Sequence, residues 1–91
     1  MTEPRLTRRA RRDLEALPRE IQEAVLELLT AIGADPESRG KQLVGRLRGL
    51  WSARAGSYRI IYTVEGAEGA PLVIVRAIRH RAVAYRRREG A

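Results

Sequence analysis

The first third of the chain places apolar residues at the spacing of an amphipathic α-helix, in two successive stretches. The first stretch predicts a helix over about Thr7–Leu17. Pro18 ends it and suits the first turn of a second helix, which Gly33 and Asp35-Pro36 end. The apolar positions are Leu6, Ala10, Leu14 and Leu17 in the first helix, and Ile21, Ala24, Val25, Leu28, Leu29 and Ile32 in the second. Two such helices joined by a tight turn predict a helical hairpin that buries its stripe on another element.

From Leu50 onward the apolar period changes to two residues, which is typical of β-strands. One half-buried strand is predicted over 57–64, and the apolar run Leu72–Ile78 predicts a central strand. The segment Glu65–Pro71 between them is predicted as a loop, and Ala82–Tyr85 as a short last strand. Helices followed by strands predict one α+β domain over residues 1–91, with the helical hairpin (about 7–34) packed on a small twisted antiparallel sheet (about 50–86).

Gly56-Ser57 is predicted to form a two-residue hairpin loop, because glycine at the first central position suits a type II′ turn. This register sets Arg54 directly opposite Arg59. The other face of the same hairpin collects the side chains that fit a core: Trp51, Ala53, Tyr58, Ile60 and Tyr62. Like charges in opposite positions repel, and local rules are most often broken at functional sites. A bound anion would turn the two arginines into a bidentate phosphate clamp, whereas without one both side chains point into solvent.

A second cluster, Arg79-His80-Arg81 followed by Tyr85, comes directly after the predicted central strand. RNA cleavage without a metal needs a base for the 2′-hydroxyl, cations for the phosphate and an acid for the leaving oxygen. Histidine is the residue type best suited to move protons near neutral pH, so His80 is a candidate catalytic residue. Tyrosine and arginine serve as acid or base only when their surroundings perturb or aim them. The structural alternatives stay open: His80 as a surface or structural residue, and Tyr85 as a core aromatic.

The net charge of the 91 residues is +7, from 18 Lys+Arg against 11 Asp+Glu. Residues 1–38 carry six Arg and eight acids, a net of −2, whereas residues 39–91 carry twelve Lys+Arg and three acids, a net of +9. This positive balance, concentrated in the C-terminal half, favours a polyanionic partner such as RNA, DNA or an acidic protein. Four basic residues, Arg39, Lys41, Arg46 and Arg48, are assigned to the polar link around Gly40–Gly49. They either line a path for RNA or belong to an ordinary solvated loop.

Composition also argues against several classes of function. The chain has no Cys and one His, so neither a thiolate nucleophile nor a metal site or other cofactor is expected. No apolar run approaches the roughly 20 residues of a membrane span. The segment Met1–Ala10 lacks the apolar core of a secretion signal, so a cytoplasmic protein is expected.

Four segments of the chain resemble the RelE branch of the RelE/ParE toxins. They are Gly45–Arg54, Gly56–Tyr62, Ile78–Arg81 and Tyr85-Arg86, with the spacing L-x-G, W-x-x-R-x-G-x-Y-R-x-x-Y and H-R-x-x-x-Y. The resemblance covers nearly the whole chain and implies the RelE-like fold. It further implies a toxin of a type II toxin–antitoxin system that enters the ribosomal A site and cuts mRNA there without a metal, leaving a cyclic phosphate. A cognate antitoxin would neutralise it by wrapping a segment around the toxin.

The same resemblance implies roles for individual residues. Arg54 and Arg59 would bind and stabilise the scissile phosphate. Arg79 or Arg81 would add charge stabilisation or supply the acid.

The identity of the general base stays open. Tyr85 would stack on a base or act as the general base, and His80 would assist proton transfer. Some RelE members have lysines at the position of Ser52 and near Arg54 that are prominent in catalysis, and this chain lacks them.

Two other functions compete with this one. A ParE-like toxin shares the fold but inhibits DNA gyrase, and it needs no Arg-His-Tyr cluster. A non-catalytic RNA-binding module is the third possibility, but Tyr58 and Tyr62 fall on the predicted core side and leave no row of exposed aromatics for stacking bases.

Overall fold

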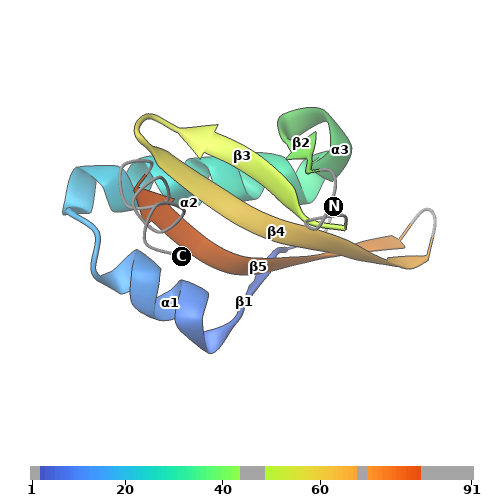
Figure 1. Cartoon of the computed structure of the whole chain (residues 1–91), viewed down its shortest axis with the longest axis horizontal. Helices are drawn as coiled ribbons and strands as arrows, with labels where there is room; N and C mark the ends of the chain where they lie inside the picture. Colours follow the sequence, from blue (N-terminus) through green and yellow to red (C-terminus); the bar gives the residue numbers. More distant parts are fainter. Residues whose placement is uncertain (1–2, 44–48, 68–69, 81–91) are drawn as a thin grey trace.

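The computed structural model describes residues 3–43, 49–67 and 70–80. The elements follow in the order β1 (Arg5–Leu6), α1 (Arg8–Glu15), α2 (Arg19–Ala34), α3 (Pro36–Arg39), β2 (Lys41–Gln42), β3 (Trp51–Ala55), β4 (Tyr58–Ala67) and β5 (Ala70–His80). The strands form one sheet in the order β1-β5-β4-β3-β2. In Figure 1 the sheet crosses the molecule with α2 behind β3 and β4, and α1 lies beside β5. The predicted α+β architecture is confirmed.

Both long helices begin and end close to the predicted positions. Thr7 caps α1, because its hydroxyl oxygen accepts a hydrogen bond from the Ala10 amide at 3.1 Å. Pro18 immediately precedes α2, as the break in the pattern predicted. The assignment of Ala24 to the apolar stripe is wrong, since this residue is exposed. Ala24 lies four residues after Glu20 and three before Glu27, so it shares their solvent-facing side of the helix.

The predicted β3–β4 hairpin is confirmed residue by residue. Its register runs from Trp51 opposite Tyr62 to Ala55 opposite Tyr58. Gly56 has a φ of +60°, whereas Ser57, like the other non-glycine residues of the described ranges, does not have a positive φ. A positive φ at the first central position alone defines the type II′ turn that the sequence predicted.

The sheet departs from the prediction at three places. The predicted loop Glu65–Pro71 is mostly strand, because β4 and β5 stay paired as far as Ala67 opposite Ala70. β1 pairs with β5 in parallel, so the sheet is mixed rather than purely antiparallel. β2 lies in the predicted polar link, where it pairs with β3. Strands of two residues are too short to show a period in the sequence. The predicted strand Ala82–Tyr85 lies outside the described residues.

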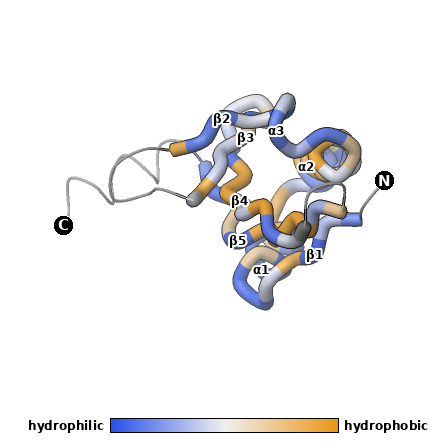
Figure 2. Tube along the Cα trace, turned by 90° about the vertical axis from the view of Figure 1, so that its right-hand side faces the viewer, coloured by the Kyte–Doolittle hydropathy of each residue, from blue (hydrophilic) through white to orange (hydrophobic). Residues whose placement is uncertain are grey.

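The core fills the space between α2 and the sheet. Val25, Leu29 and Ile32 of α2 are buried against the inward side chains of the strands: Ala53, Ile60, Tyr62, Val73, Val75 and Ile78. Figure 2 shows these apolar positions along β4 and β5 and on the inner side of α2. The predicted core face of the hairpin is therefore confirmed, with Trp51 and Tyr58 packed at its margin.

The outer edge of β5 is closed by the N-terminal segment. The Thr7 amide donates to the Val75 carbonyl oxygen at 3.0 Å, at the end of β1. Farther along, Asp13 of α1 accepts a hydrogen bond from the Ile78 amide at 3.0 Å. Satisfying these backbone groups leaves this part of β5 unavailable for pairing with another strand.

Candidate nucleic-acid interface

Three arginines lie directly opposite one another across three neighbouring strands. Arg54 of β3 pairs with Arg59 of β4, and Arg59 pairs with Arg79 of β5. Directly opposite residues point to the same side of a sheet, so all three side chains share the face that α2 does not cover. Neighbouring strands are about 4.8 Å apart, so this arginine row spans about 10 Å.

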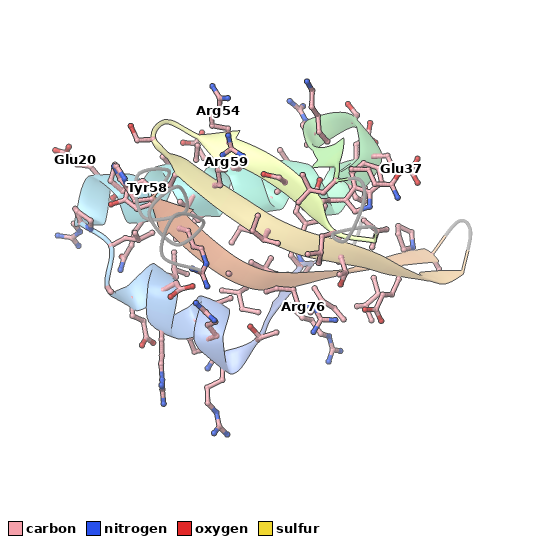
Figure 3. All side chains as sticks on the ribbon, in the orientation of Figure 1. Glu20, Glu37, Arg54, Tyr58, Arg59 and Arg76 are labelled. Atoms are coloured by element: carbon pink, nitrogen blue, oxygen red, sulfur yellow. The ribbon has the colours of Figure 1, made fainter. Side chains whose placement is uncertain are left out.

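Local packing holds the row in place from the other side of the sheet. The neighbours of Arg59 along β4 are Tyr58 and Ile60, which both point toward the core, and Ile60 is fully buried. Arg59 and Arg79 are half-buried, whereas Arg54 is exposed at the end of the row. In Figure 3 Arg54 and Arg59 lie close together beside the β3–β4 turn. The buried face therefore fixes the backbone from which the guanidinium groups project.

No carboxylate neutralises the arginine row within the described residues. The ion pair present in those ranges joins Arg76, in the middle of β5, to Glu65 of β4 at 3.2 Å. Three cations in register with no anionic partner repel one another. Arginine forks match the geometry of a phosphate group, and a bound phosphate would convert this repulsion into attraction.

A pocket of about 450 Å³ opens beside the row, between α3–β2 and the β3–β4 hairpin. Four of its lining residues are cationic: Arg39, Lys41, Arg54 and Arg59. The remaining lining residues are Ser38, Gly40, Leu43, Ser52 and Ala53, so the lining has two hydroxyl groups and no acid. A concave surface lined by one sign of charge concentrates the electric field and attracts anions.

The wall of the pocket is tied to the core through Tyr62. The Tyr62 hydroxyl donates a buried hydrogen bond of 2.7 Å to the carbonyl oxygen of Pro36, at the start of α3. Burial raises the pKa of Tyr62 to about 12, so the phenol stays protonated and keeps donating. Gly40 lies against this hydroxyl so closely that a Cβ there would overlap it. This contact brings the start of β2 down onto β3, where Lys41 pairs with Ser52.

The structure separates His80 from the arginine row. His80 pairs with Tyr58 across β4 and β5, and the two rings meet edge to face with centroids 5.1 Å apart. Tyr58 packs against the core, so His80 projects from the face opposite to Arg59 and Arg79. A catalytic role for His80 stays a prediction, and it requires the proton path to pass around the end of β5.

The other predicted site residues divide into two groups. Lys41 lies in the pocket beside the row, and Arg39 joins it there. Arg46, Arg48, Arg81 and Tyr85 lie outside the described residues. In the ranges that the structure covers, no three His, Asp or Glu side chains come together as metal ligands. None of the helices in these ranges is long and apolar enough to span a membrane.

Comparison with known proteins identifies the class to which this fold and surface belong. Residues 5–85 match the ParE toxin family of type II toxin–antitoxin systems. The chain therefore belongs to the RelE/ParE toxins of type II toxin–antitoxin systems.

Individual relatives carry RelE-type names. The chain is 43% identical to Toxin RelG of Mycobacterium tuberculosis over 84 residues, which are 91% of this chain and 94% of that one. It is 37% identical to Toxin RelE of the same organism over 82 residues, 89% of this chain and 82% of the relative.

Solved structures agree with this placement. The crystal structure of the toxin–antitoxin complex RelBE2 from Mycobacterium tuberculosis matches with a TM-score of 0.78 and 36% identity, covering 88% of this chain and 98% of that one. An archaeal RelE–RelB complex from Pyrococcus horikoshii matches in fold with a TM-score of 0.68 at 24% identity, covering 89% and 97% of the two chains.

Proposed function

We propose that this toxin is an endoribonuclease that cleaves mRNA in the A site of the ribosome and thereby inhibits translation. The observation that carries the proposal is the arginine row, three cations in register with no carboxylate partner in the described residues. Like-charge repulsion in this row disfavours the free protein, and binding of an anion relieves it. A surface that stabilises a phosphate with growing negative charge requires such unbalanced positive charge.

The proposed reaction needs no metal. The 2′-oxygen attacks the adjacent phosphorus, the bond from phosphorus to the 5′-oxygen breaks, and a cyclic phosphate and a 5′-hydroxyl result. One group removes the proton of the 2′-hydroxyl and another protonates the leaving oxygen. Arg59, the middle residue of the row, is placed to stabilise the crowded phosphate, flanked by Arg54 and Arg79.

Proton transfer in this proposal falls to residues after the arginine row. Tyr85 is the proposed base, with His80 assisting, and Arg81 supplies the acid or further charge. In this proposal the ribosome orders the mRNA and aligns its phosphate with these residues.

The proposal includes a cognate antitoxin as the protein partner. The RelBE2 and archaeal RelE–RelB structures, to which this chain is similar, are toxin–antitoxin complexes. An antitoxin that covers the arginine row would block phosphate binding directly. The protein would act in the cytoplasm, where the ribosomes are.

Gyrase inhibition is the second candidate function, because the matching family is described as the ParE toxin of the parDE system. A gyrase inhibitor needs a surface for a protein rather than a phosphate clamp. The two functions therefore differ in what they require of Arg59.

Mapping of new mRNA 5′ ends after brief induction in cells separates these candidates. The proposal predicts cuts confined to translated frames, and it predicts their loss in Arg59→Ala. The matched control is Arg19→Ala, which removes an exposed arginine at the start of α2, away from the pocket. Growth arrest with intact mRNA would overturn the proposal and favour gyrase as the target.

A further inference from the structure

We propose that Arg39 and Lys41, with the hydroxyl of Ser38, form a second phosphate subsite next to the arginine row. This inference rests on the proposed function, since it takes single-stranded RNA as the ligand. The RNA backbone would run from the arginine row across β3 into the pocket, so that two neighbouring phosphates are held at once.

The register of β2 places Lys41 on the same face as the row. Lys41 is opposite Ser52 of β3, and Ser52 lies two residues from Arg54, so all three point to one side of the sheet. A diagonal pair of this kind is separated by about 7–8 Å. Lys41 therefore supplies a cation one strand beyond Arg54 and two residues farther along the strand direction.

Arg39 stands on the far wall of the same pocket. It is the last residue of α3, two positions before Lys41, and it is exposed. The chain enters the sheet between these two residues, and the pocket of about 450 Å³ is lined by both of them and by Arg54. The cations thus stand on two walls of one hollow, an arrangement that fits a ligand with two spaced charges better than a single small anion.

The polar groups of the pocket favour phosphate over a carboxylate-bearing partner. Ser38 and Ser52 provide hydroxyl donors between the cations, and the lining contains no acid that would compete for them. Backbone phosphates of nucleic acids are bound by this mixture of Arg, Lys and Ser side chains. Leu43 and Ala53 offer limited apolar contact beside them.

The test compares two RNA ligands in NMR titrations of the purified protein at several salt concentrations. A dinucleotide has one phosphodiester and requires one subsite, whereas a hexanucleotide requires both. The double variant Arg39→Ala/Lys41→Ala is expected to bind the hexanucleotide several-fold more weakly. The slope of log K against log salt should fall by about 0.7 in magnitude, the value for one lost phosphate contact on single strands. The affinity for the dinucleotide should stay unchanged.

The control Arg8→Ala/Arg19→Ala removes the same charge from exposed positions on α1 and α2 and should leave both titrations unchanged. Arg39→Lys/Lys41→Arg, which keeps both charges, should retain the salt dependence. The proposal is overturned if the Arg39→Ala/Lys41→Ala variant binds the hexanucleotide as the wild type does, or if it loses affinity equally for both ligands. Absence of hexanucleotide binding by the wild type at low salt would overturn it too. Failure of the proposed function shows itself differently, as intact mRNA in cells, and leaves these titrations unaffected.

Discussion

The uncovered face of the sheet carries Arg59 near the start of β4 and Arg76 in the middle of β5, and their surroundings differ. Arg76 is bound to Glu65 at 3.2 Å, and Thr63 donates a hydrogen bond to the same carboxylate oxygen. Arg59, on the same face, is flanked by two further arginines in register. One arginine is neutralised within the protein and the other is surrounded by like charge.

Arg76 is thus neutralised within the protein, whereas Arg59 is a candidate for binding an anion. A surface ion pair between exposed groups contributes about 0–1 kcal/mol and attracts no ligand. An uncompensated row lowers the stability of the protein slightly and strengthens binding of an anion. Other arginines of the described residues, such as Arg8 and Arg19, also have no carboxylate partner there. The candidate site is therefore identified by three arginines in register on neighbouring strands, unpaired within the described ranges, and not by the lack of a partner alone.

The largest expected effect is the loss of mRNA cleavage when Arg59, the middle residue of the row, is replaced by alanine. Arg59→Ala should slow mRNA cleavage by about 10²–10³-fold, the usual loss when one donor to a developing negative charge is removed. Its free energy of unfolding should stay equal or rise, because a like-charge repulsion is relieved. Single-turnover cleavage and urea denaturation measure the two quantities. Arg76→Ala is the control, and a similar rate loss there would contradict the distinction between Arg59 and the neutralised Arg76.

A smaller effect is expected when the charge of the row is kept and its shape is changed. Arg59→Lys preserves the positive charge but loses the bidentate fork, so cleavage should fall by about 10-fold, less than for alanine. The rates of Arg59→Lys and Arg59→Ala measured under identical conditions give this ordering. If Arg59→Lys cleaves as slowly as Arg59→Ala, the bidentate geometry of arginine determines the rate. If Arg59→Lys cleaves as fast as the wild type, the positive charge alone determines it.

The pocket wall provides a prediction about stability. Tyr62→Phe removes the buried hydrogen bond to Pro36 and leaves its carbonyl oxygen unpaired, which should cost about 1–3 kcal/mol of unfolding free energy. Gly40→Ala should also be destabilising, because its Cβ overlaps the Tyr62 hydroxyl. The double variant Gly40→Ala/Tyr62→Phe should lose less unfolding free energy than the sum of the two single losses, because the hydroxyl oxygen that the new Cβ would overlap is absent. Additive losses in urea denaturation would show that the two residues are not in contact.

The same tyrosine predicts how stability depends on alkaline pH. The pKa of Tyr62 is raised to about 12 by burial, above the value of about 10 in the unfolded chain. The folded state therefore holds the proton more tightly, and stability falls as the pH rises from about 10 to 12. Denaturation at pH 9 and pH 11 should show this decrease in the wild type, and a smaller one in Tyr62→Phe. Equal decreases would exclude Tyr62 as the source.

The smallest effect is expected at the ion pair between Glu65 and Arg76. Glu65→Gln should lower the unfolding free energy by about 0.5 kcal/mol at low salt, because the ion pair with Arg76 is about half exposed on both sides. High salt should remove this difference. Cleavage should not change, and a large loss of cleavage would mean that this part of the sheet also takes part in function.

The sequence predicted the hairpin that presents Arg54 and Arg59, because the Gly56-Ser57 turn and the apolar alternation specify a single register. It did not predict that Arg79 completes the row, since the pairing of β5 depends on a bulge between Ile61 and Tyr62 that has no local signal.

The pocket was missed for a different reason. Its wall consists of α3 and β2, which are too short to show a period, and it is held by a contact between Tyr62 and Pro36 that are 26 residues apart. Likewise, the side of the sheet on which His80 lies follows from its pairing with Tyr58 and not from its place in the chain.

The proposed function requires the arginine row to act on a phosphodiester of mRNA. The most direct measurement is to place a defined mRNA in the A site of purified ribosomes, add the toxin and determine the chemistry of the new ends. We expect a single cut that leaves a cyclic phosphate and a 5′-hydroxyl. The cut should be lost in Arg59→Ala and kept in Arg76→Ala. Intact mRNA under conditions in which the toxin inhibits purified gyrase would contradict the proposed function.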